Sequence, residues 1–355
     1  MINKQKTGVA IAGIGFGESV HLPALISTKN GLPIALWHPN AQKLNQACTK
    51  HNLKGYSDWN FLLNDQSIEA IIIATPPGPR FQLAKEALEA GKHLLLEKPI
   101  ALNANQAEEL QRIALKNNLS VAVDFEYRAV PLFMTLKSIL EQKQIGDIWL
   151  VKFDWLMSSR ANESRPWNWY SSKEQGGGVV GALGTHAFDM IHWLFGPSKE
   201  VNAYLSTSIP SRYCKDTNKE KPVSSEDICL AQLEITEIYN KNKIPIQISL
   251  SSVSRQGRGC WIEIYGREGT LIIGSNNQAD YVHGFGLWLA EKNGPLKNIS
   301  ADKKFGFSKT WKDGRIAPVA RIQEWWLNSI SQGTPIIPGL IEGIASQKVC
   351  DKILN

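Results

Sequence analysis

The chain has 355 residues, 43% of them hydrophobic and 20% charged, with 39 basic and 33 acidic residues and a formal net charge of +6. This composition excludes an intrinsically disordered chain and a membrane-embedded one, and the length favours two domains over one. The charges are scattered without a long basic run, so they suit a phosphate-bearing small ligand and give no argument for a nucleic-acid partner.

The first predicted strand, residues 8–12, runs directly into a glycine-rich turn. The segment after the strand is Gly13-Ile14-Gly15-Phe16-Gly17-Glu18. Closely spaced glycines between a strand and a helix let the backbone approach a pyrophosphate, which then faces the N–H groups of that helix. The dinucleotide-binding pattern places a glycine where this chain has Glu18, so the pattern is incomplete. The turn indicates either a nucleotide site or a plain tight turn.

The next predicted strand, residues 33–37, lacks the acid that commonly ends this strand in dinucleotide-binding folds. It is followed by His38-Pro39-Asn40, without a nearby carboxylate. Such an acid hydrogen-bonds the adenosine ribose of NAD, and without it the site would not repel the 2′-phosphate of NADP. We therefore expect NAD or NADP as the cofactor, with NADP favoured and with His38 or Lys43 meeting the 2′-phosphate. A surface loop histidine is the alternative for His38.

Strands and helices then alternate as far as residue 124. Helices are predicted at 41–51, 59–63, 80–90 and 105–116, and strands at 70–74, 94–96 and 121–124. This spacing predicts a doubly wound parallel sheet, an α/β domain of the Rossmann type, over residues 1–125. The apolar run 94–96 ends in Glu97-Lys98-Pro99, and open α/β sheets bind ligands at the carboxyl ends of their strands. Lys98 is therefore a candidate catalytic residue, with a plain surface lysine as the alternative.

These segments together resemble the Gfo/Idh/MocA oxidoreductase family, which includes glucose–fructose oxidoreductase and inositol dehydrogenase. The resemblance rests on segments that follow the order and spacing of the family: the glycine turn, His21-Leu22-Pro23-Ala24-Leu25, Ala74-Thr75-Pro76-Pro77, Ala90-Gly91-Lys92-His93 and Glu97-Lys98-Pro99. It covers nearly the whole chain. The resemblance implies a Rossmann domain followed by an α+β domain with a large, predominantly antiparallel open sheet.

The resemblance also implies roles for individual residues. Those expected at the cofactor are Gly13, Ile14, Gly15, Phe16 and Gly17 at the pyrophosphate, Thr75 and Pro76 beside the nicotinamide half, and Glu97 at the nicotinamide ribose. Lys98 is expected between nicotinamide and substrate. Oxidising an alcohol by hydride transfer requires removal of the hydroxyl proton, and a lysine near a positively charged nicotinamide should have its pKa lowered toward the working pH. We therefore expect Lys98 to act as the acid or base.

Beyond residue 125 the pattern becomes that of a second domain, residues 126–355. Strands are predicted at 148–156, 200–206, 229–234, 246–252 and 261–265, helices at 131–142, 321–331 and 341–354, an exposed loop at 214–222 and a long connection at 294–316. Alternating apolar and polar residues are typical of an antiparallel sheet with one exposed face. The resemblance implies that this domain binds the substrate and pairs sheet to sheet in a homodimer or homotetramer. The last helix is expected either within this domain or packed back on the first.

The segment 176–189 resembles the histidine-bearing motif of the family. A helix predicted at 183–194 places His186 and Asp189 on one face. The resemblance implies that His186 lies in the active site, but the family's aspartate four residues before the histidine is Ala182 here. Without that acid, His186 binds a substrate hydroxyl while Lys98 handles the proton, or Asp189 or Tyr127 substitutes for the acid. Structural roles are the alternative for His186 and Asp189.

An aromatic and polar loop precedes this segment. It contains Arg165-Pro166-Trp167-Asn168-Trp169-Tyr170. Aromatic rings lie flat against the apolar faces of sugars, while arginine and asparagine reach hydroxyls, so the loop suits a polyol substrate. We expect Arg165 and Trp167 to contact substrate, and Trp167 also to contact the cofactor. The chain has 12 tryptophans, so a role in the core is the alternative for Trp167.

The five cysteines are odd in number, widely separated and without metal-ligand spacing. We therefore expect reduced thiols, no bound metal and a cytoplasmic protein. The N-terminal residues 1–7 are short and polar, which leaves no room for a signal peptide, and no apolar run approaches the length of a membrane span. The expected partner is a small sugar or polyol, with neither nucleic acid nor membrane.

These features predict an NAD(P)-dependent oxidoreductase that transfers hydride between nicotinamide and a CH–OH or C=O group of a sugar, cyclitol or related polyol. The main alternative is a non-catalytic dinucleotide-binding regulatory protein, as are the galactose-pathway repressors of the family. Ala182 and Glu18 favour that alternative, whereas Lys98 argues against it. A family enzyme acting on a non-sugar carbonyl or a tetrapyrrole, as biliverdin reductases do, is a further alternative.

Overall fold

The computed structural model describes residues 6–238, 242–277 and 281–355. The chain divides into two compact units, the first made of Met1–Glu126 with Lys309–Gln347 and the second of Tyr127–Ser308 with Lys348–Asn355. The chain thus returns to the first unit after it has completed most of the second. Within the described ranges, no helix has the length and apolar character needed to cross a membrane.

The first unit is built on a parallel sheet of six strands. The strands are β1 (Thr7–Ala12), β2 (Gly31–Trp37), β3 (Lys54–Tyr56), β4 (Ala70–Ile73), β5 (His93–Leu96) and β6 (Val121–Val123). Their order is β3-β2-β1-β4-β5-β6, and all neighbours run parallel. This is the doubly wound Rossmann order, in which the chain reverses its direction of winding between β1 and β4. The predicted fold of this part is confirmed.

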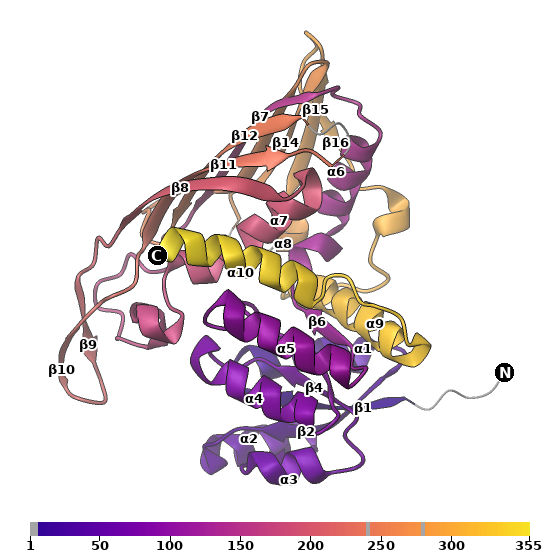
Figure 1. The fold of residues 1–355 in the computed structure, drawn as a ribbon, viewed down its shortest axis with the longest axis vertical. Coiled ribbons are helices and arrows are strands. Elements are labelled where there is room, and N and C mark those ends of the chain that lie inside the picture. Colours follow the sequence, from indigo (N-terminus) through magenta and orange to yellow (C-terminus); the bar gives the residue numbers. More distant parts are fainter. Residues whose placement is uncertain (1–5, 239–241, 278–280) are drawn as a thin grey trace. The chain divides into compact units, whose positions relative to one another are not determined.

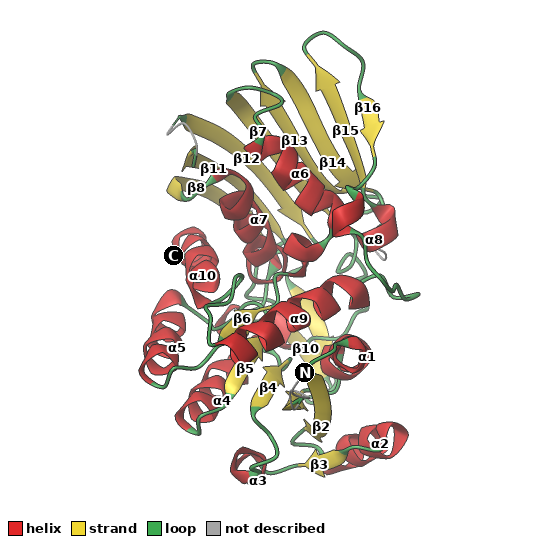
Figure 2. Ribbon diagram, turned by 90° about the vertical axis from the view of Figure 1, so that its right-hand side faces the viewer, coloured by secondary structure: helices red, strands yellow, loops and turns green. Residues whose placement is uncertain are grey.

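Helices cover both faces of this sheet. They are α1 (Leu22–Ser27), α2 (Ala41–His51), α3 (Trp59–Asn64), α4 (Pro77–Glu89), α5 (Ala104–Lys116), α9 (Ile316–Gln332) and the first part of α10 (Leu340–Leu354). α4 packs beside α5 on one face, and α1 packs beside α9 on the other (Figure 2). Both faces of β4 are therefore buried, which explains its unbroken run of apolar residues.

The second unit is built on an eight-stranded sheet. Its strands are β7 (Ile148–Leu156), β8 (Ser198–Ser206), β11 (Ile228–Thr236), β12 (Lys243–Ser251), β13 (Gly259–Gly266), β14 (Gly269–Ser275), β15 (Gly286–Glu291) and β16 (Lys297–Ile299). Their order is β16-β15-β14-β13-β7-β12-β11-β8, and β12–β7 is the one parallel pair among them. The sheet is therefore predominantly antiparallel, as predicted.

Helices α6 (Pro131–Glu141) and α7 (Thr185–Phe195) pack on one face of this sheet (Figure 2). Residues along β11 alternate between buried and exposed, because one side of the strand meets this core and the other does not. Shorter elements complete the unit: η3 (Trp169–Ser171), η4 (Lys173–Gln175), η5 (Val180–Gly184), α8 (Tyr281–Gly284) and η6 (Lys303–Phe305), with η2 (Glu126–Ala129) at the boundary between the units.

Two expectations about loops are wrong. Residues 214–222 were expected to form an exposed loop, but most of them belong to a hairpin of β9 (Ser211–Cys214) and β10 (Lys219–Pro222), visible as a separate ribbon in Figure 1. Most side chains of this hairpin are exposed, so no apolar alternation marks the strands. The connection expected at 294–316 contains β16 and η6, and α9 begins at Ile316 rather than at residue 321.

Candidate active site

The glycine turn after β1 has the geometry of a dinucleotide-binding loop. Gly13 has φ +106°, and a Cβ on it would lie 2.7 Å from the carbonyl oxygen of Ala74, so only glycine fits. A Cβ on Gly17 would lie 2.9 Å from Cγ2 of Ile11, so this glycine permits close packing of the turn η1 (Gly17–His21) on β1. A Cβ on Gly15 would meet no atom within 4 Å. The backbone at Gly15 is therefore open to a ligand.

Glu18 does not disrupt this turn. The close approach that the sequence pattern assigns to position 18 is made by Gly17, one residue earlier. The Glu18 carboxylate binds Lys50 Nζ at 2.9 Å and His51 Nε2 at 2.9 Å, both on α2. The hydrogen bond from Lys50 lowers the pKa of Glu18, which outweighs the effect of partial burial. The residue thus ties the turn to α2.

The two residues predicted to contact a 2′-phosphate, His38 and Lys43, come after β2, in the connection to α2 and in its first turn. His38 Nδ1 accepts a hydrogen bond from Asn40 N at 3.0 Å, and Asn40 Oδ1 in turn caps α2 by accepting from Lys43 N at 2.9 Å. Lys43 is exposed in the first turn of α2. Both His38 and Lys43 therefore follow the carboxyl end of β2, which neighbours β1 in the sheet.

Thr75 and Arg80 connect the carboxyl ends of β4 and β5. The buried guanidinium of Arg80 donates to the carbonyl oxygens of Thr75, Glu97 and Pro99. Burial lowers the pKa of Arg80 to about 10. Thr75 Oγ1 is buried and has no hydrogen-bond partner among the described residues. Thr75 and Pro76 therefore lie at the strand ends where the fold binds ligands, and the Thr75 hydroxyl can serve a bound group.

Glu97 lies at the end of β5, beside Lys98. Its carboxylate contacts His21 Nε2 at 3.1 Å through Oε1 and accepts from the backbone N–H of Lys98 at 3.2 Å through Oε2. Burial opposes ionisation of Glu97, but the hydrogen bond from His21 and the surrounding positive charges prevail and lower its pKa to about 2. Glu97 is thus an ionised carboxylate, and Lys98 is half-buried next to it.

The structure adds two buried carboxyl groups that the sequence did not single out for function, those of Asp124 and Glu126. Asp124 at the end of β6 is fully buried, and one of its oxygens lies 3.6 Å from His21 Nε2. Burial raises the pKa of Asp124 well above its usual value, and the charge of Glu97 raises it further. Burial also raises the pKa of Glu126 to about 8. The signal available in the sequence was a carboxylate as the last residue of the strand predicted at 121–124.

In the second unit, His186 is held among aromatic rings. It lies in the first turn of α7 and is 4% exposed. The ring of Tyr127 meets it edge to face at 5.0 Å between centroids, and the ring of Trp155 lies at 6.2 Å. Ala182, in the place of the family's aspartate, is half-buried in η5. The structure thus brings together the predicted residues Tyr127 and His186.

Asp189 follows one turn later on α7 and is bound on both carboxylate oxygens. Arg128 Nε donates to Oδ2 at 2.8 Å, and Arg128 Nη2 donates to Oδ1 at 2.6 Å. Both side chains are buried. This arrangement matches the structural alternative for Asp189, and the predicted substrate contact stays a prediction.

The aromatic loop is anchored to the β9–β10 hairpin. Trp167 Nε1 donates to the carbonyl oxygen of Pro222 at 3.1 Å, and Lys221 Nζ lies 3.5 Å from the centroid of the Trp167 ring. The buried Arg212 of the hairpin donates to the carbonyl oxygens of Arg160 and Arg165 at 2.6 and 3.3 Å. Arg165 itself is exposed. The hairpin therefore fixes the position of both predicted loop residues.

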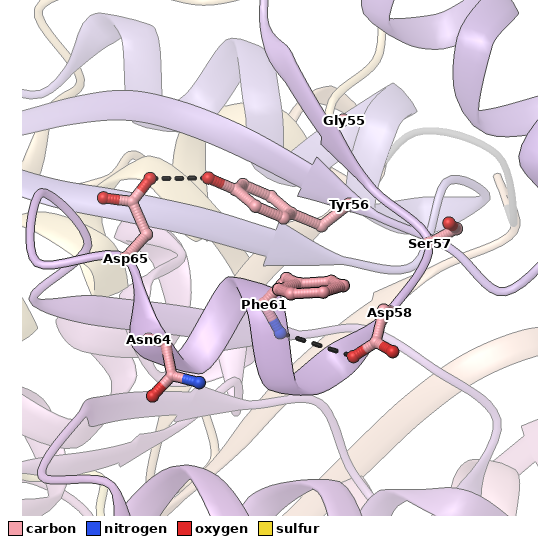
Figure 3. Close-up of a pocket in the computed structure, with 7 residues that line it drawn as sticks. All are labelled: Gly55, Tyr56, Ser57, Asp58, Phe61, Asn64 and Asp65. Atoms are coloured by element: carbon pink, nitrogen blue, oxygen red, sulfur yellow. Dashed lines mark hydrogen bonds between the residues drawn. The ribbon is translucent and has the colours of Figure 1, made fainter.

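A separate cavity of about 490 Å³ lies at the edge of the first unit, between β3 and α3 (Figure 3). Tyr56 in its wall donates to Asp65 Oδ2 at 2.6 Å, and Asp58 caps α3 by accepting from the backbone N–H of Phe61 at 3.3 Å. None of the residues predicted for the site lines this cavity. The cavity is therefore distinct from the glycine turn after β1.

Two family models match the chain. Residues 7–125 match the NAD-binding Rossmann fold of an oxidoreductase family, and residues 137–355 match the C-terminal alpha/beta domain of the same family. The first match covers the glycine turn, and the second covers the helix that carries His186.

Several known proteins are similar over most of their length. An uncharacterized oxidoreductase of Synechocystis sp. is 40% identical over 97% of this chain and 92% of its own. Levoglucosan dehydrogenase of Pseudarthrobacter phenanthrenivorans is 26% identical, covering 82% of this chain and 79% of its own. A solved structure of levoglucosan dehydrogenase with NADH and levoglucosan has a TM-score of 0.86 at 22% identity, covering 99% of this chain and 96% of that one. That structure supports the fold.

Proposed function

The chain belongs to the Gfo/Idh/MocA oxidoreductase family, and from this premise we propose that it transfers hydride between NAD(H) or NADP(H) and a CH–OH or C=O group of a sugar, cyclitol or related polyol. The observation that carries the proposal is the set of groups at adjacent strand ends of the first unit. The open Gly15 backbone, the unpartnered Thr75 hydroxyl, and Glu97 with Lys98 follow β1, β4 and β5 in turn.

The residues of the first unit fit a dinucleotide. Gly13 and Gly17 set the turn, and Gly15 leaves room for a pyrophosphate at its backbone. We propose that the ionised Glu97 carboxylate accepts hydrogen bonds from the hydroxyls of the nicotinamide ribose. We also propose that Thr75 Oγ1 makes a polar contact with the cofactor. Pro76, Ile14 and Phe16 complete the proposed cofactor contacts.

Lys98 is the proposed acid or base. The bound nicotinamide supplies or accepts the hydride. In the oxidation direction Lys98 Nζ takes the proton of the reacting hydroxyl, and in the reduction direction it returns that proton to the carbonyl oxygen. We propose that His186 hydrogen-bonds a substrate hydroxyl and that Tyr127, its aromatic neighbour, helps to hold it. Lys98 thus carries the proton without the aspartate that Ala182 replaces.

The cofactor proposal covers NAD and NADP. NAD is supported by the structural neighbours that bind NADH. NADP is supported by the end of β2, where His38, Pro39 and Asn40 stand in the place of an acid and Lys43 follows in α2. A positively charged Lys43 would attract the 2′-phosphate.

The substrate proposal is a sugar or polyol. Levoglucosan dehydrogenase and the D-xylose dehydrogenase of Paenarthrobacter nicotinovorans are among the relatives of the chain. The loop that contains Arg165 and Trp167 has the composition expected for sugar recognition, and the hairpin fixes its position. We propose that residues 126–355 bind the substrate and also a second copy of the chain, in a cytoplasmic homodimer or homotetramer.

Exposed apolar side chains support pairing through the sheet. Trp149, Tyr204 and Leu230 lie on β7, β8 and β11 and are 59%, 68% and 48% exposed. Tyr204 and Leu230 lie directly opposite each other on β8 and β11, and neighbouring large apolar side chains on an exposed sheet face are typical of an interaction surface.

A second candidate function is a regulatory protein that binds the dinucleotide without turnover, and Ala182 is the observation that favours it. One experiment separates the two. The protein is titrated with NADH and NADPH by fluorescence, and sugars, inositols and their keto forms are then screened for absorbance change at the nicotinamide band. Binding with turnover on a polyol supports the enzyme. Binding without turnover across a broad panel supports the regulatory protein, and Ala182→Asp is then tested for recovery of activity.

A further inference from the structure

Two carboxyl groups, those of Glu97 and Asp124, lie together around His21 in the first unit. One atom each of His21, Glu97 and Asp124 lies within 4.8 Å of the others, and all three residues are buried. The charges of Glu126 and Lys98 both act on the pKa of Asp124, and the charge of Lys98 also acts on the pKa of Glu97. A buried carboxylate is costly unless hydrogen-bond donors or positive charges compensate its loss of water, so these acids cannot all be ionised without such partners. The hydrogen bonds of the cluster decide which acid carries the charge.

Gln323 on α9 fixes the proton position of the His21 ring. Gln323 Nε2 donates to the backbone carbonyl oxygen of His21 at 3.2 Å and to its Nδ1 at 3.1 Å. The reversed amide would set two oxygens against each other at the first of these contacts. His21 Nδ1 is therefore an acceptor, and the ring proton lies on Nε2.

The His21 Nε2–H is directed to one carboxyl group rather than two. It lies 3.1 Å from Glu97 Oε1 but 3.6 Å from Asp124 Oδ2, beyond a normal hydrogen bond. Glu97 also accepts from the backbone N–H of Lys98. Both oxygens of Asp124 are buried without a hydrogen-bond donor among the described residues. Glu97 therefore has two donors and Asp124 has none.

We propose that Asp124 is a carboxylic acid whose O–H donates to Glu97, and that this O–H and the His21 Nε2–H together hold the Glu97 carboxylate in position beside Lys98. A proton on Asp124 removes the repulsion between the two acids and gives Glu97 a third donor. The raised pKa of Asp124 and the lowered pKa of Glu97 agree with this division of charge. Asp124 and His21 are thus positioning residues.

The same three residues also have the composition of a metal site, and the hydrogen bonds argue against that use. A metal on His21 would need the lone pair of Nε2, but Gln323 places the ring proton there. The described part of the chain therefore favours a proton over a cation between Asp124 and Glu97. An added divalent ion tests this directly.

The first experiment measures the proton itself, without cofactor or substrate. The protein is labelled with ¹³C at the aspartate carboxyl, and the Asp124 resonance is assigned by its absence in Asp124→Asn. The proposal expects a protonated carboxyl that does not titrate between pH 5 and pH 7. An ionised Asp124 at pH 7 overturns it. The protein is also titrated with Mn²⁺ alone, and saturable binding that is lost in Asp124→Asn overturns it as well.

The second experiment measures the consequence for Glu97 and rests on the proposed function of that residue. Asp124→Asn replaces the O–H donor by an N–H donor of the same shape, whereas Asp124→Ala removes it. We expect Asp124→Ala to weaken NADH binding at least about tenfold, the effect of one hydrogen bond to a charged group, and Asp124→Asn to restore most of that loss. Equal losses in both variants reject the donor role. If wild-type protein binds no dinucleotide, the proposed function fails while the carboxyl resonance still decides the protonation of Asp124.

Discussion

Arg128 and Asp189 form a bidentate ion pair inside the second unit, with N···O distances of 2.8 and 2.6 Å. Asp189 lies on α7, one turn after His186, and Arg128 belongs to η2. The guanidinium also lies 5.7 Å from the centre of the Trp193 ring on the same helix. The pair therefore fixes α7, and with it His186, to the segment that carries Tyr127.

Removing one partner should cost much stability. We expect Asp189→Ala to lower the free energy of unfolding by about 3–5 kcal/mol, because it leaves a buried guanidinium without its carboxylate. Urea denaturation measures this. The double replacement Arg128→Met with Asp189→Leu should lose much less, since no charge is left buried. If Asp189→Ala unfolds like wild type but raises KM for the sugar, Asp189 contacts substrate instead.

Lys98→Met should abolish turnover while dinucleotide affinity stays within about tenfold of wild type. The variant loses the group proposed to move the proton in the transition state, and most ground-state contacts with the cofactor should remain. Steady-state kinetics and NADH fluorescence titration check the two parts. Lys116→Met at the exposed end of α5 is the matched control and should behave as wild type. Full activity of Lys98→Met would reject the assignment of this lysine.

The glycine turn offers a matched pair of substitutions. Gly15→Ala should fold with unchanged stability, because its Cβ meets no atom within 4 Å. It should weaken NADH binding at least about tenfold, because its Cβ would occupy the space that we propose for the pyrophosphate. Gly17→Ala should lower the free energy of unfolding by about 1–3 kcal/mol, because its Cβ would lie 2.9 Å from the stiff side chain of Ile11. Thermal unfolding measures the change in stability of each variant, and NADH titration measures its change in cofactor affinity. Normal NADH affinity in Gly15→Ala would place the pyrophosphate elsewhere.

Lys43→Ala should weaken NADPH binding more than NADH binding. Lys43 is exposed in the first turn of α2, after the end of β2 that lacks an acid, and only NADPH carries the 2′-phosphate that its charge would meet. Fluorescence titrations with both cofactors at one salt concentration give the ratio. Equal losses for NADH and NADPH would show that no 2′-phosphate binds there.

Glu126 should make the protein less stable as the pH rises. Burial raises its pKa in the folded state to about 8, from an ordinary value near 4.5. Between these two values the folded state holds a proton that the unfolded state has lost, so stability falls by up to about 1.4 kcal/mol per pH unit from this group alone. The loss is complete above about pH 8.

Glu126→Gln should flatten this decline. Urea denaturation of the cofactor-free protein at pH 5, 6, 7 and 8 compares the variant with wild type and with Glu174→Gln, which changes an exposed carboxyl of η4 in the same way. We expect the Glu126→Gln curve to lose stability more slowly than the other two as the pH rises. Three parallel curves would mean that Glu126 is already ionised at pH 5.

The sequence predicted those helices and strands in which apolar residues recur regularly. The α2 helix and strand β7 have the predicted bounds, 41–51 and 148–156, because apolar residues recur there at the period of the element. Strands β9 and β10 were missed because their side chains are mostly exposed and their charged residues show no alternation. Strand β3, only three residues long, gave no signal of this kind.

The candidate site was predictable where it is local. The glycine turn and Lys98 follow directly from strand ends in the sequence. The cluster of His21, Glu97 and Asp124 could not be predicted from the sequence, because the sheet order brings together three segments that are far apart in the chain. The pairing of Asp189 with Arg128 likewise depends on tertiary structure. Their positions had to come from the fold.

The place of β7 in its sheet bears on how the second unit folds. The sheet consists of two groups of strands, β8-β11-β12 and β13-β14-β15-β16, in each of which the order across the sheet follows the order along the chain, and β7 joins the two groups. It is synthesised before all its partners, and both β12 and β13 come much later. Closing so long a loop costs entropy before any pairing compensates it, so the joining of the two groups is expected to be a slow step. During translation β7 remains an apolar strand with two open edges, which makes it the segment of this unit most exposed to aggregation.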